Sequence, residues 1–408
     1  MTRRYIPFLL VLTLGIVALI ALPGPSAPRP PLAPALSRTF EFVYQVHVPP
    51  SQNAMGPLRL WIPLPADDGY QDVHSLHVDS PAAYSQGHDP EYKDRYAMFT
   101  PTAGQAAAGF DVTMRFVATR REHRVTLDSD SRGASADGST DPADPLLPRY
   151  LEPDKLVPLN GTIAELAKEH TVGDTTPLEK SRHIYDYVVS TMRYDKSGEG
   201  WGRGDAIWAC TSKRGNCTDF HSLFIGMMRA SGIPARFEIG FPLPEDKSEG
   251  EISGYHCWAE FYLNGIGWVP VDASEAWKNP AKHDYFFGAH DVNRVFFTYG
   301  RDIKLSPEQK SAPLNYFIYP YAEANGQPVR GLQTHFSFRD VSPSATRSST
   351  LTLPRAPRSI PSGILTFHPL ASSAAFATVS FVKFVPLFRW RYPEARSTCP
   401  STRGYEPC

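Results

Sequence analysis

The chain has almost no excess charge of either sign. Its 41 lysines and arginines nearly balance its 42 aspartates and glutamates, and the net charge is -1. Such a chain offers no electrostatic reason to bind nucleic acid or an anionic membrane surface, and we expect neither as a partner. Apolar residues make up 42% and charged residues 20% of the sequence, which is typical of a folded, globular protein.

Cysteine is scarce, with five residues in 408. They are Cys210, Cys217, Cys257, Cys399 and Cys408. An odd count leaves at least one thiol without an intramolecular disulfide partner. In an oxidising compartment, paired thiols tend to become disulfides, and one hypothesis joins Cys210 to Cys257.

The sequence has no CxxC pair, so it lacks the spacing of common structural zinc sites. The alternative zinc site would use Cys210, Cys217, His221 and Cys257. Because these spacings fit no standard metal pattern, we expect neither a metal nor another cofactor.

Residues 1–35 resemble an export signal. Arg3 and Arg4 precede a nearly apolar run over residues 6–22, and Ala33-Pro34-Ala35 offers a cleavage motif. The alternative is an uncleaved membrane anchor, since the run is close to the minimum length of a span. Both alternatives place the remaining chain outside the cytoplasm, as a periplasmic, secreted or membrane-anchored protein.

The next part of the chain predicts strands. Alternating apolar residues over 40–48 and 110–116, with a further run over 58–64, indicate a small β-sandwich-like domain over residues 39–127. Asp, Ser, Gly and Pro dominate residues 128–149, which we predict to be a linker.

Residues 150–325 carry helical signals followed by strands. A short helix is expected near residues 162–169, and Thr176, Pro177 and Glu179 predict the start of a second. A third is expected from Cys217 to Ser231, followed by strands over 237–241, 255–263 and 268–272. Residues 326–408 lack clear periodicity, and we predict a poorly structured tail.

The segment Gly215-Asn216-Cys217-Thr218-Asp219 brings a cysteine to the expected start of the third helix. Unpaired N–H groups and the helix dipole at that end favour a thiolate, and they can also stabilise an oxyanion. This arrangement predicts a nucleophilic cysteine.

His256 lies on a predicted strand that is followed by an Asn264-Gly265 turn and a return strand ending in Asp272. A three-residue loop over 263–265 would place His256 opposite Asp272, with Gly265 in a left-handed conformation. A two-residue turn would send Asp272 to the other face of the hairpin. We predict the three-residue loop, because a carboxylate beside the imidazole would fix its tautomer.

Four segments, 215–220, 232–236, 256–261 and 267–272, together resemble the transglutaminase-like superfamily. The resemblance covers about residues 150–325, in the order Cys, His, Asp. It implies an α+β fold: a papain-like transglutaminase core, here preceded by the β-sandwich-like domain. It also implies the catalytic residues Cys217 as nucleophile, His256 as general acid and base, and Asp272 as the orienting carboxylate.

The family also uses a second oxyanion donor upstream of the cysteine, for which Trp208 and Tyr194 are weak candidates. The implied reaction is acyl transfer at amide bonds of a protein or peptide substrate through a thioester. Hydrolysis is favoured over cross-linking by the resemblance. The alternative is a non-catalytic module that keeps the groove to bind a peptide or cell-wall ligand.

Overall fold

The structure is a computed structural model that describes residues 36–50, 57–127 and 144–342. The predicted export segment lies outside these residues, as do Cys399 and Cys408. None of the helices within the described ranges combines the length and the hydropathy that a membrane span requires.

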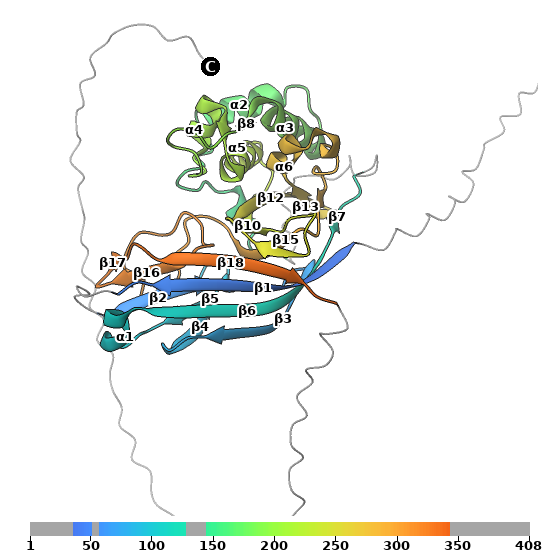
Figure 1. Cartoon of the computed structure of the whole chain (residues 1–408). Helices are drawn as coiled ribbons and strands as arrows, with labels where there is room; N and C mark the ends of the chain where they lie inside the picture. Colours follow the sequence, from blue (N-terminus) through green and yellow to red (C-terminus); the bar gives the residue numbers. More distant parts are fainter. Residues whose placement is uncertain (1–35, 51–56, 128–143, 343–408) are drawn as a thin grey trace, which may run out of the picture.

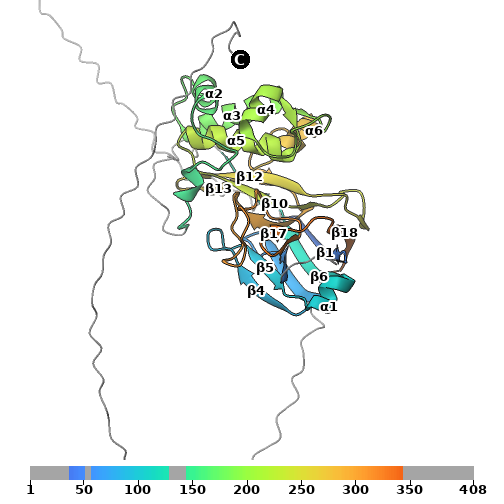
Figure 2. The same cartoon turned by 90° about the vertical axis from the view of Figure 1, so that its left-hand side faces the viewer.

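The fold has three layers, which are visible in Figure 1. Helices cover one side of a four-stranded sheet, and a β-sandwich packs on the other side. The turned view in Figure 2 keeps the same order of helices, central sheet and sandwich. The predicted α+β fold is therefore confirmed.

The sandwich consists of two five-stranded sheets. The first has the order β11 (Glu249–Glu251), β18 (Gln333–Asp340), β1 (Ser37–Val48), β6 (Phe110–Arg121) and β3 (Gln71–Asp79). The second has the order β17 (Gln327–Pro328), β16 (Tyr321–Ala324), β2 (Leu58–Pro63), β5 (Arg95–Phe99) and β4 (Tyr84–His88). A six-residue helix, α1 (Ala103–Ala108), precedes β6.

The prediction of a poorly structured tail from residue 326 is wrong for β17 and β18. Strand β18 pairs with β1 in antiparallel register, so that Phe336 lies opposite Tyr44 and Phe338 opposite Phe42. Both phenylalanines are buried. The alternation in this segment is short, and the long-range pairing with β1 is what stabilises it. The predicted tail beyond residue 342 lies outside the described residues.

The sandwich is therefore completed by segments from beyond residue 127. Strand β11 and strand β16 come from inside the predicted catalytic segment, and β18 follows it. Part of the predicted linker is also packed, because Leu147 and Tyr150 are buried. The remainder of that linker, residues 128–143, is not among the described residues.

Aromatic side chains join the sandwich to the central sheet. Phe42 on β1 has its ring centroid 5.3 Å from that of Phe241 and 6.0 Å from that of Phe297. Phe116 on β6 stacks on Phe42 at 5.3 Å. All four rings are at most 1% exposed, so the two regions share one hydrophobic core.

The central sheet has the order β13 (Gly267–Val271), β12 (His256–Leu263), β10 (Ala235–Pro242) and β15 (Arg294–Tyr299). Its helical layer contains α2 (Thr162–His170), α3 (Pro177–Thr191), α4 (Ala206–Ser212), α5 (Cys217–Ala230) and α6 (Ala273–Lys278). Two short pairs complete the sheets: β7 (His123–Arg124) with β14 (Ala289–His290), and β8 (Arg193–Tyr194) with β9 (Arg214–Gly215).

The helix starts follow the predicted capping chemistry. Thr176 caps α3 and forms a reciprocal capping box with Glu179, with Pro177 in the first turn. Helix α5 is buried along almost its whole length, because α2, α3 and α4 surround it and β12 lies beneath it. A helix buried on all sides holds its first residue firmly in place.

Candidate active site

Helix α5 begins at Cys217, as the sequence predicts. Asn216 caps it and accepts a hydrogen bond from the Thr218 N–H at 2.9 Å. The Asp219 side chain in turn accepts from the Asn216 N–H at 2.9 Å. This reciprocal capping box fixes the first turn, and the cysteine is 1% exposed.

The same Asp219 anchors a glycine-rich loop before α4. Its carboxylate accepts hydrogen bonds from the backbone N–H groups of Gly202 at 2.7 Å and Gly204 at 3.0 Å. Both glycines have a positive φ angle, which residues with a Cβ atom rarely adopt. One carboxylate therefore ties the loop to the first turn of the helix that carries Cys217.

His256 and Asp272 meet inside the protein. The His256 Nε2 atom lies 2.7 Å from the Asp272 Oδ2 atom, and the two residues are 4% and 0% exposed. Because Nε2 faces the carboxylate, Nδ1 is the nitrogen left for the hydrogen bond between His256 and Cys217. The three predicted site residues are thus brought together.

The hairpin reaches this arrangement by a different register from the predicted one. Leu263 pairs with Gly267, so the three-residue loop covers residues 264–266 and not 263–265. The shift is two residues, and side chains alternate with period two, so Asp272 stays on the His256 face. Gly265 has φ +82°, the left-handed conformation predicted for it.

Electrostatics in this cluster favour a thiolate and an imidazolium. Burial raises the pKa of Cys217, but its contacts with Cys257 and His256 outweigh burial and hold the pKa well below its usual value. Burial lowers the pKa of His256, but Asp272 and Cys217 raise it by more than burial lowers it, and the resulting pKa is about 10. At neutral pH the proton therefore resides on the imidazole.

Asp272 is held by more partners than the sequence indicates. Arg294 on β15 lies 3.3 Å from Oδ2, while Oδ1 accepts from Ser274 Oγ at 3.1 Å and from the Glu275 N–H at 3.0 Å. Burial raises the pKa of Asp272, but His256 and Arg294 hold it well below its usual value. The carboxylate is therefore ionised, and it also caps α6.

Cys257 follows His256 on β12 and faces α5. Its Sγ lies 3.7 Å from Thr218 Oγ1 and 3.7 Å from His221 Nδ1. The hypothesis of a disulfide between Cys210 and Cys257 is wrong, because no such bond joins these two cysteines. Nor do the cysteines and His221 form a group of potential metal ligands among the described residues.

His221 lies one turn after Cys217 and is fully buried. Its Nε2 accepts a hydrogen bond from the Ala273 N–H at 3.2 Å. Burial lowers its pKa, although the neighbouring Asp272 and Cys217 act in the opposite direction. The Cys-x3-His spacing is the sequence signal that marks this residue as a neighbour of the cysteine.

The two candidate oxyanion donors differ in position. Tyr194 on β8 pairs with Gly215, two residues before Cys217, and its pKa is raised by burial and then by Cys217. The indole of Trp208 instead packs beside Gly200 in the glycine-rich loop. A third group, Tyr255, was not predicted: its hydroxyl accepts from Asn216 Nδ2 at 3.0 Å and lies 2.8 Å from Thr218 Oγ1.

Known proteins resemble the chain in sequence and fold. Residues 164–273 match the transglutaminase-like superfamily. An uncharacterized protein of Haemophilus influenzae is 30% identical over 332 residues, which cover 71% of this chain and 86% of that protein. The uncharacterized protein YebA of Bacillus subtilis is 27% identical over 150 residues, 33% of this chain and 20% of YebA.

The fold resembles the crystal structure of a proposed cysteine protease from Cytophaga hutchinsonii. The TM-score is 0.51 at 14% sequence identity, with 76% of this chain and 92% of that chain covered. Because the sequence match spans the segment from α2 to Asp272 and the Haemophilus relative extends over most of both chains, this chain belongs to the transglutaminase-like superfamily.

Proposed function

We propose that this protein is a thiol-dependent acyl-transfer enzyme that acts on amide bonds. Cys217 is the nucleophile, His256 the general acid and base, and Asp272 the carboxylate that orients the imidazole. The observation that supports this assignment best is the 2.7 Å contact between His256 and Asp272, next to a cysteine at the first residue of a helix.

The reaction follows from where the protons reside. The Cys217 thiolate attacks the amide carbonyl, and the N–H groups at the start of α5 stabilise the oxyanion. The C–N bond breaks as His256 gives its proton to the leaving amine. His256 then takes a proton from the incoming nucleophile, whose new bond to the acyl carbon displaces Cys217 as the thiolate and restores the thiolate–imidazolium pair.

Hydrolysis is the favoured outcome, with water resolving the thioester of a protein or peptide substrate. The likeness in fold to a proposed cysteine protease supports a protease or amidase. An amine in place of water would produce a cross-link through the same three residues. The N-terminal segment supports action outside the cytoplasm.

The near-complete burial of Cys217 favours one other candidate, a module that binds a peptide or cell-wall ligand without chemistry. A binding module does not need a thiolate, a charged imidazole and an ionised carboxylate in contact. Their combination in one buried cluster therefore supports catalysis over binding alone.

The test is a peptide library incubated with the full chain, with and without an added primary amine, and analysed by mass spectrometry. We expect new peptide termini or deamidation in wild type and none with Cys217→Ala. A covalent peptide adduct at Cys217, trapped by acid quench, would identify the thioester. Peptide binding that leaves every peptide intact and is equal in Cys217→Ala would contradict the enzyme and support the binding module.

A further inference from the structure

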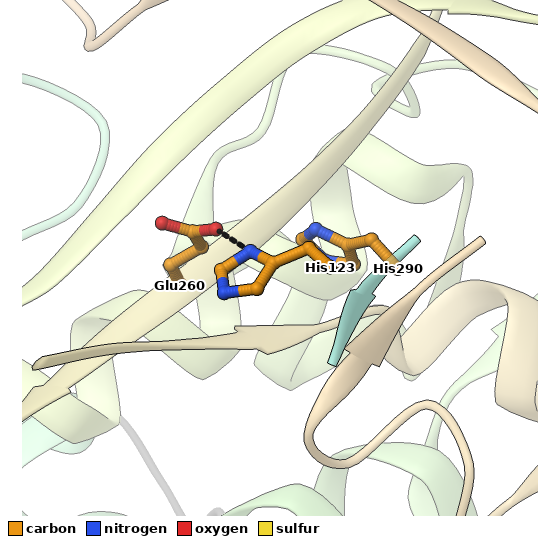
Figure 3. Close-up of side chains that lie close together, drawn as sticks. All are labelled: His123, Glu260 and His290. Carbon is orange, nitrogen blue, oxygen red and sulfur yellow. Dashed lines mark ion pairs between the residues drawn. The ribbon is translucent and has the colours of Figure 1, made fainter. Parts of the chain in front are cut away.

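Three ligating side chains converge at a second place, where the sandwich meets the central sheet. They are His123 on β7, Glu260 on β12 and His290 on β14, and Figure 3 shows the imidazole of His123 beside the Glu260 carboxylate. One nitrogen or oxygen from each lies within 4.8 Å of those from the other two. All three residues are buried, with exposures of 4%, 3% and 0%.

The sheet geometry brings these side chains together. Strands β7 and β14 are antiparallel, and His123 lies directly opposite His290. Side chains that face each other across such a pair stand about 5 Å apart. Glu260 reaches the same point from β12, and its Oε1 atom is 3.0 Å from His123 Nδ1.

The hydrogen bonds leave ligating atoms unused. His290 Nε2 lies 3.1 Å from the Val271 carbonyl oxygen, and because a carbonyl only accepts, Nε2 carries the proton. In the neutral ring Nδ1 then holds a free lone pair, and it is buried without a hydrogen-bond partner. His123 Nδ1 is likewise buried without a hydrogen bond, despite the nearby carboxylate.

Buried polar atoms without partners are uncommon in folded proteins. Two of them here belong to residues whose ligating atoms lie within 4.8 Å of one carboxylate. Arg236 hydrogen-bonds to Oε2 of Glu260, which leaves Oε1 for another partner. Two imidazoles and one carboxylate form a ligand set that suits a divalent transition-metal ion.

We propose that His123 Nδ1, His290 Nδ1 and Glu260 Oε1 form a binding site for a divalent transition-metal ion of the Zn²⁺ class. Bonds of about 2.0–2.2 Å would place the ligand atoms about 3.4 Å apart. The atoms now lie within 4.8 Å of one another, so side-chain rotation would have to bring them closer when the ion binds. The bond from His290 to Val271 fixes the ring orientation, as outer partners of metal-bound histidines do.

An adjoining cavity provides the route of entry. It has a volume of about 280 Å³ and is lined by His123 and Glu260 together with Tyr70, Arg236 and Trp268. Tyr70 stacks on the His123 ring at 3.7 Å, which limits how far that ring can move. Water in this cavity would supply the fourth ligand, and the bound ion would connect the β7–β14 pair to strand β12 of the central sheet.

The test measures zinc in the full chain, purified without a polyhistidine tag. Since active-site thiols also bind zinc, the background is Cys217→Ala. We expect one zinc per chain after dialysis, and a Tm about 5 °C higher in zinc at a hundred times its Kd than in chelator. Co²⁺ should produce tetrahedral d–d bands without a thiolate charge-transfer band.

Two variants remove a ligand with limited disturbance. His123→Phe keeps a ring stacked on Tyr70, and Glu260→Gln keeps the side-chain shape; each should lower zinc affinity at least 10-fold. The matched control is His47→Ala, which removes an exposed histidine that pairs with Asp111 at 2.7 Å. It should bind zinc like the parent protein.

Absence of retained zinc in the parent protein would overturn the proposal. Zinc retained at full affinity by folded His123→Phe and Glu260→Gln would do the same, as would a Co²⁺ spectrum dominated by thiolate charge transfer. Circular dichroism establishes which variants are folded. If both ligand variants unfold, the parent's Co²⁺ spectrum decides, because nitrogen and oxygen ligation supports the site and sulfur ligation excludes it.

Discussion

Strand β12 carries two similar clusters along one face. At its start, His256 contacts the Asp272 carboxylate, which also contacts Arg294. Four residues later, Glu260 is a carboxylate that contacts both His123 and Arg236. Each cluster thus has an imidazole, a carboxylate and a guanidinium, and all of these residues are buried except Arg236, whose side chain is 16% exposed.

The two clusters differ in their third partner. The imidazole of His256 has the Cys217 thiol on its other side, whereas His123 faces a second imidazole, that of His290. Strand β10 differs as well, because it places Gly240 opposite His256 and Arg236 opposite Glu260. A thiol beside an imidazole suits nucleophilic chemistry, and two imidazoles beside a carboxylate suit metal binding.

Trp258 lies between the clusters. Its ring centroid is 5.9 Å from that of His256 and 5.8 Å from that of His290. Arg294 lies over the same indole at 4.8 Å. One face of β12 thus carries both the proposed catalytic cluster and the proposed metal site, with a large side chain in the space between them.

The largest expected effect separates the two carboxylates by function. Asp272→Asn keeps an oxygen to cap α6 but no longer stabilises the His256 imidazolium. We expect turnover of a cleaved peptide to fall about 10²–10⁴-fold. Zinc stoichiometry at the second cluster should stay unchanged, as measured on the same preparation.

The matched control is Asp111→Asn, which disrupts an exposed pair with His47 and should leave turnover within about 2-fold. Equal losses of turnover in Asp111→Asn and Asp272→Asn would mean that the carboxylate at 272 has no special role.

The second prediction concerns Gly240, the β10 residue opposite His256. A Cβ atom there would lie 1.8 Å from the Val295 carbonyl oxygen, a backbone atom that cannot easily move. We expect Gly240→Ala to lower the free energy of unfolding by about 3 kcal/mol or more, as measured by urea denaturation.

Gly104 in α1 provides the control, because a Cβ atom added there would have no neighbouring atom within 4 Å. Gly104→Ala should raise stability by up to about 1 kcal/mol, since alanine favours helix. A Gly240→Ala protein as stable as wild type would show that the space opposite His256 is not restricted.

The third prediction is a pH profile for alkylation of Cys217 by iodoacetamide. Because the pKa of Cys217 is lowered and that of His256 is raised to about 10, the thiolate–imidazolium pair persists through neutral pH. The wild-type rate should change little between about pH 6 and pH 9. In His256→Ala it should rise with an ordinary thiol pKa, and be about 100-fold lower than wild type at pH 6.

The chain has four other cysteines, so the labelled peptide is identified by mass spectrometry. A wild-type profile that follows an ordinary thiol pKa would contradict the charged pair.

The smallest effect concerns the residue between the clusters. Trp258 Nε1 donates to Glu238 Oε2, and both residues are buried. Trp258→Phe keeps an aromatic ring there but removes the donor, so we expect a loss of about 1–3 kcal/mol in unfolding free energy. Glu238→Gln in the same background should recover part of it, and no recovery would contradict the hydrogen-bond explanation.

Local signals predicted much of the fold and of the candidate active site. Helix capping at Cys217 and the turn at Asn264-Gly265 depend on residues within a few positions of each other. The structure has the start of α5 and a three-residue hairpin loop at these places. The two-residue shift in hairpin register was not predictable from the turn alone. Because the register shift is an even number of residues, Asp272 still lies on the predicted face of the hairpin.

Long-range partners were not predictable in the same way. His123, Glu260 and His290 are separated by 137 and 30 positions, which no spacing rule connects. Arg294 also reaches Asp272 from a strand that sequence periodicity does not link to it. Strand β18 was missed because its stability comes from pairing with β1.

The pairing of β1 with β18 also determines when the protein can finish folding. A chain growing from its N-terminus makes β1 and β2 early, but their neighbours β18 and β16 are made only after the transglutaminase-like segment. Until then each strand has an open edge that invites pairing with another chain. The sandwich and the core that it shares with the central sheet are therefore complete only when the chain has been made up to residue 340. Until then the nascent chain needs protection from pairing with other chains.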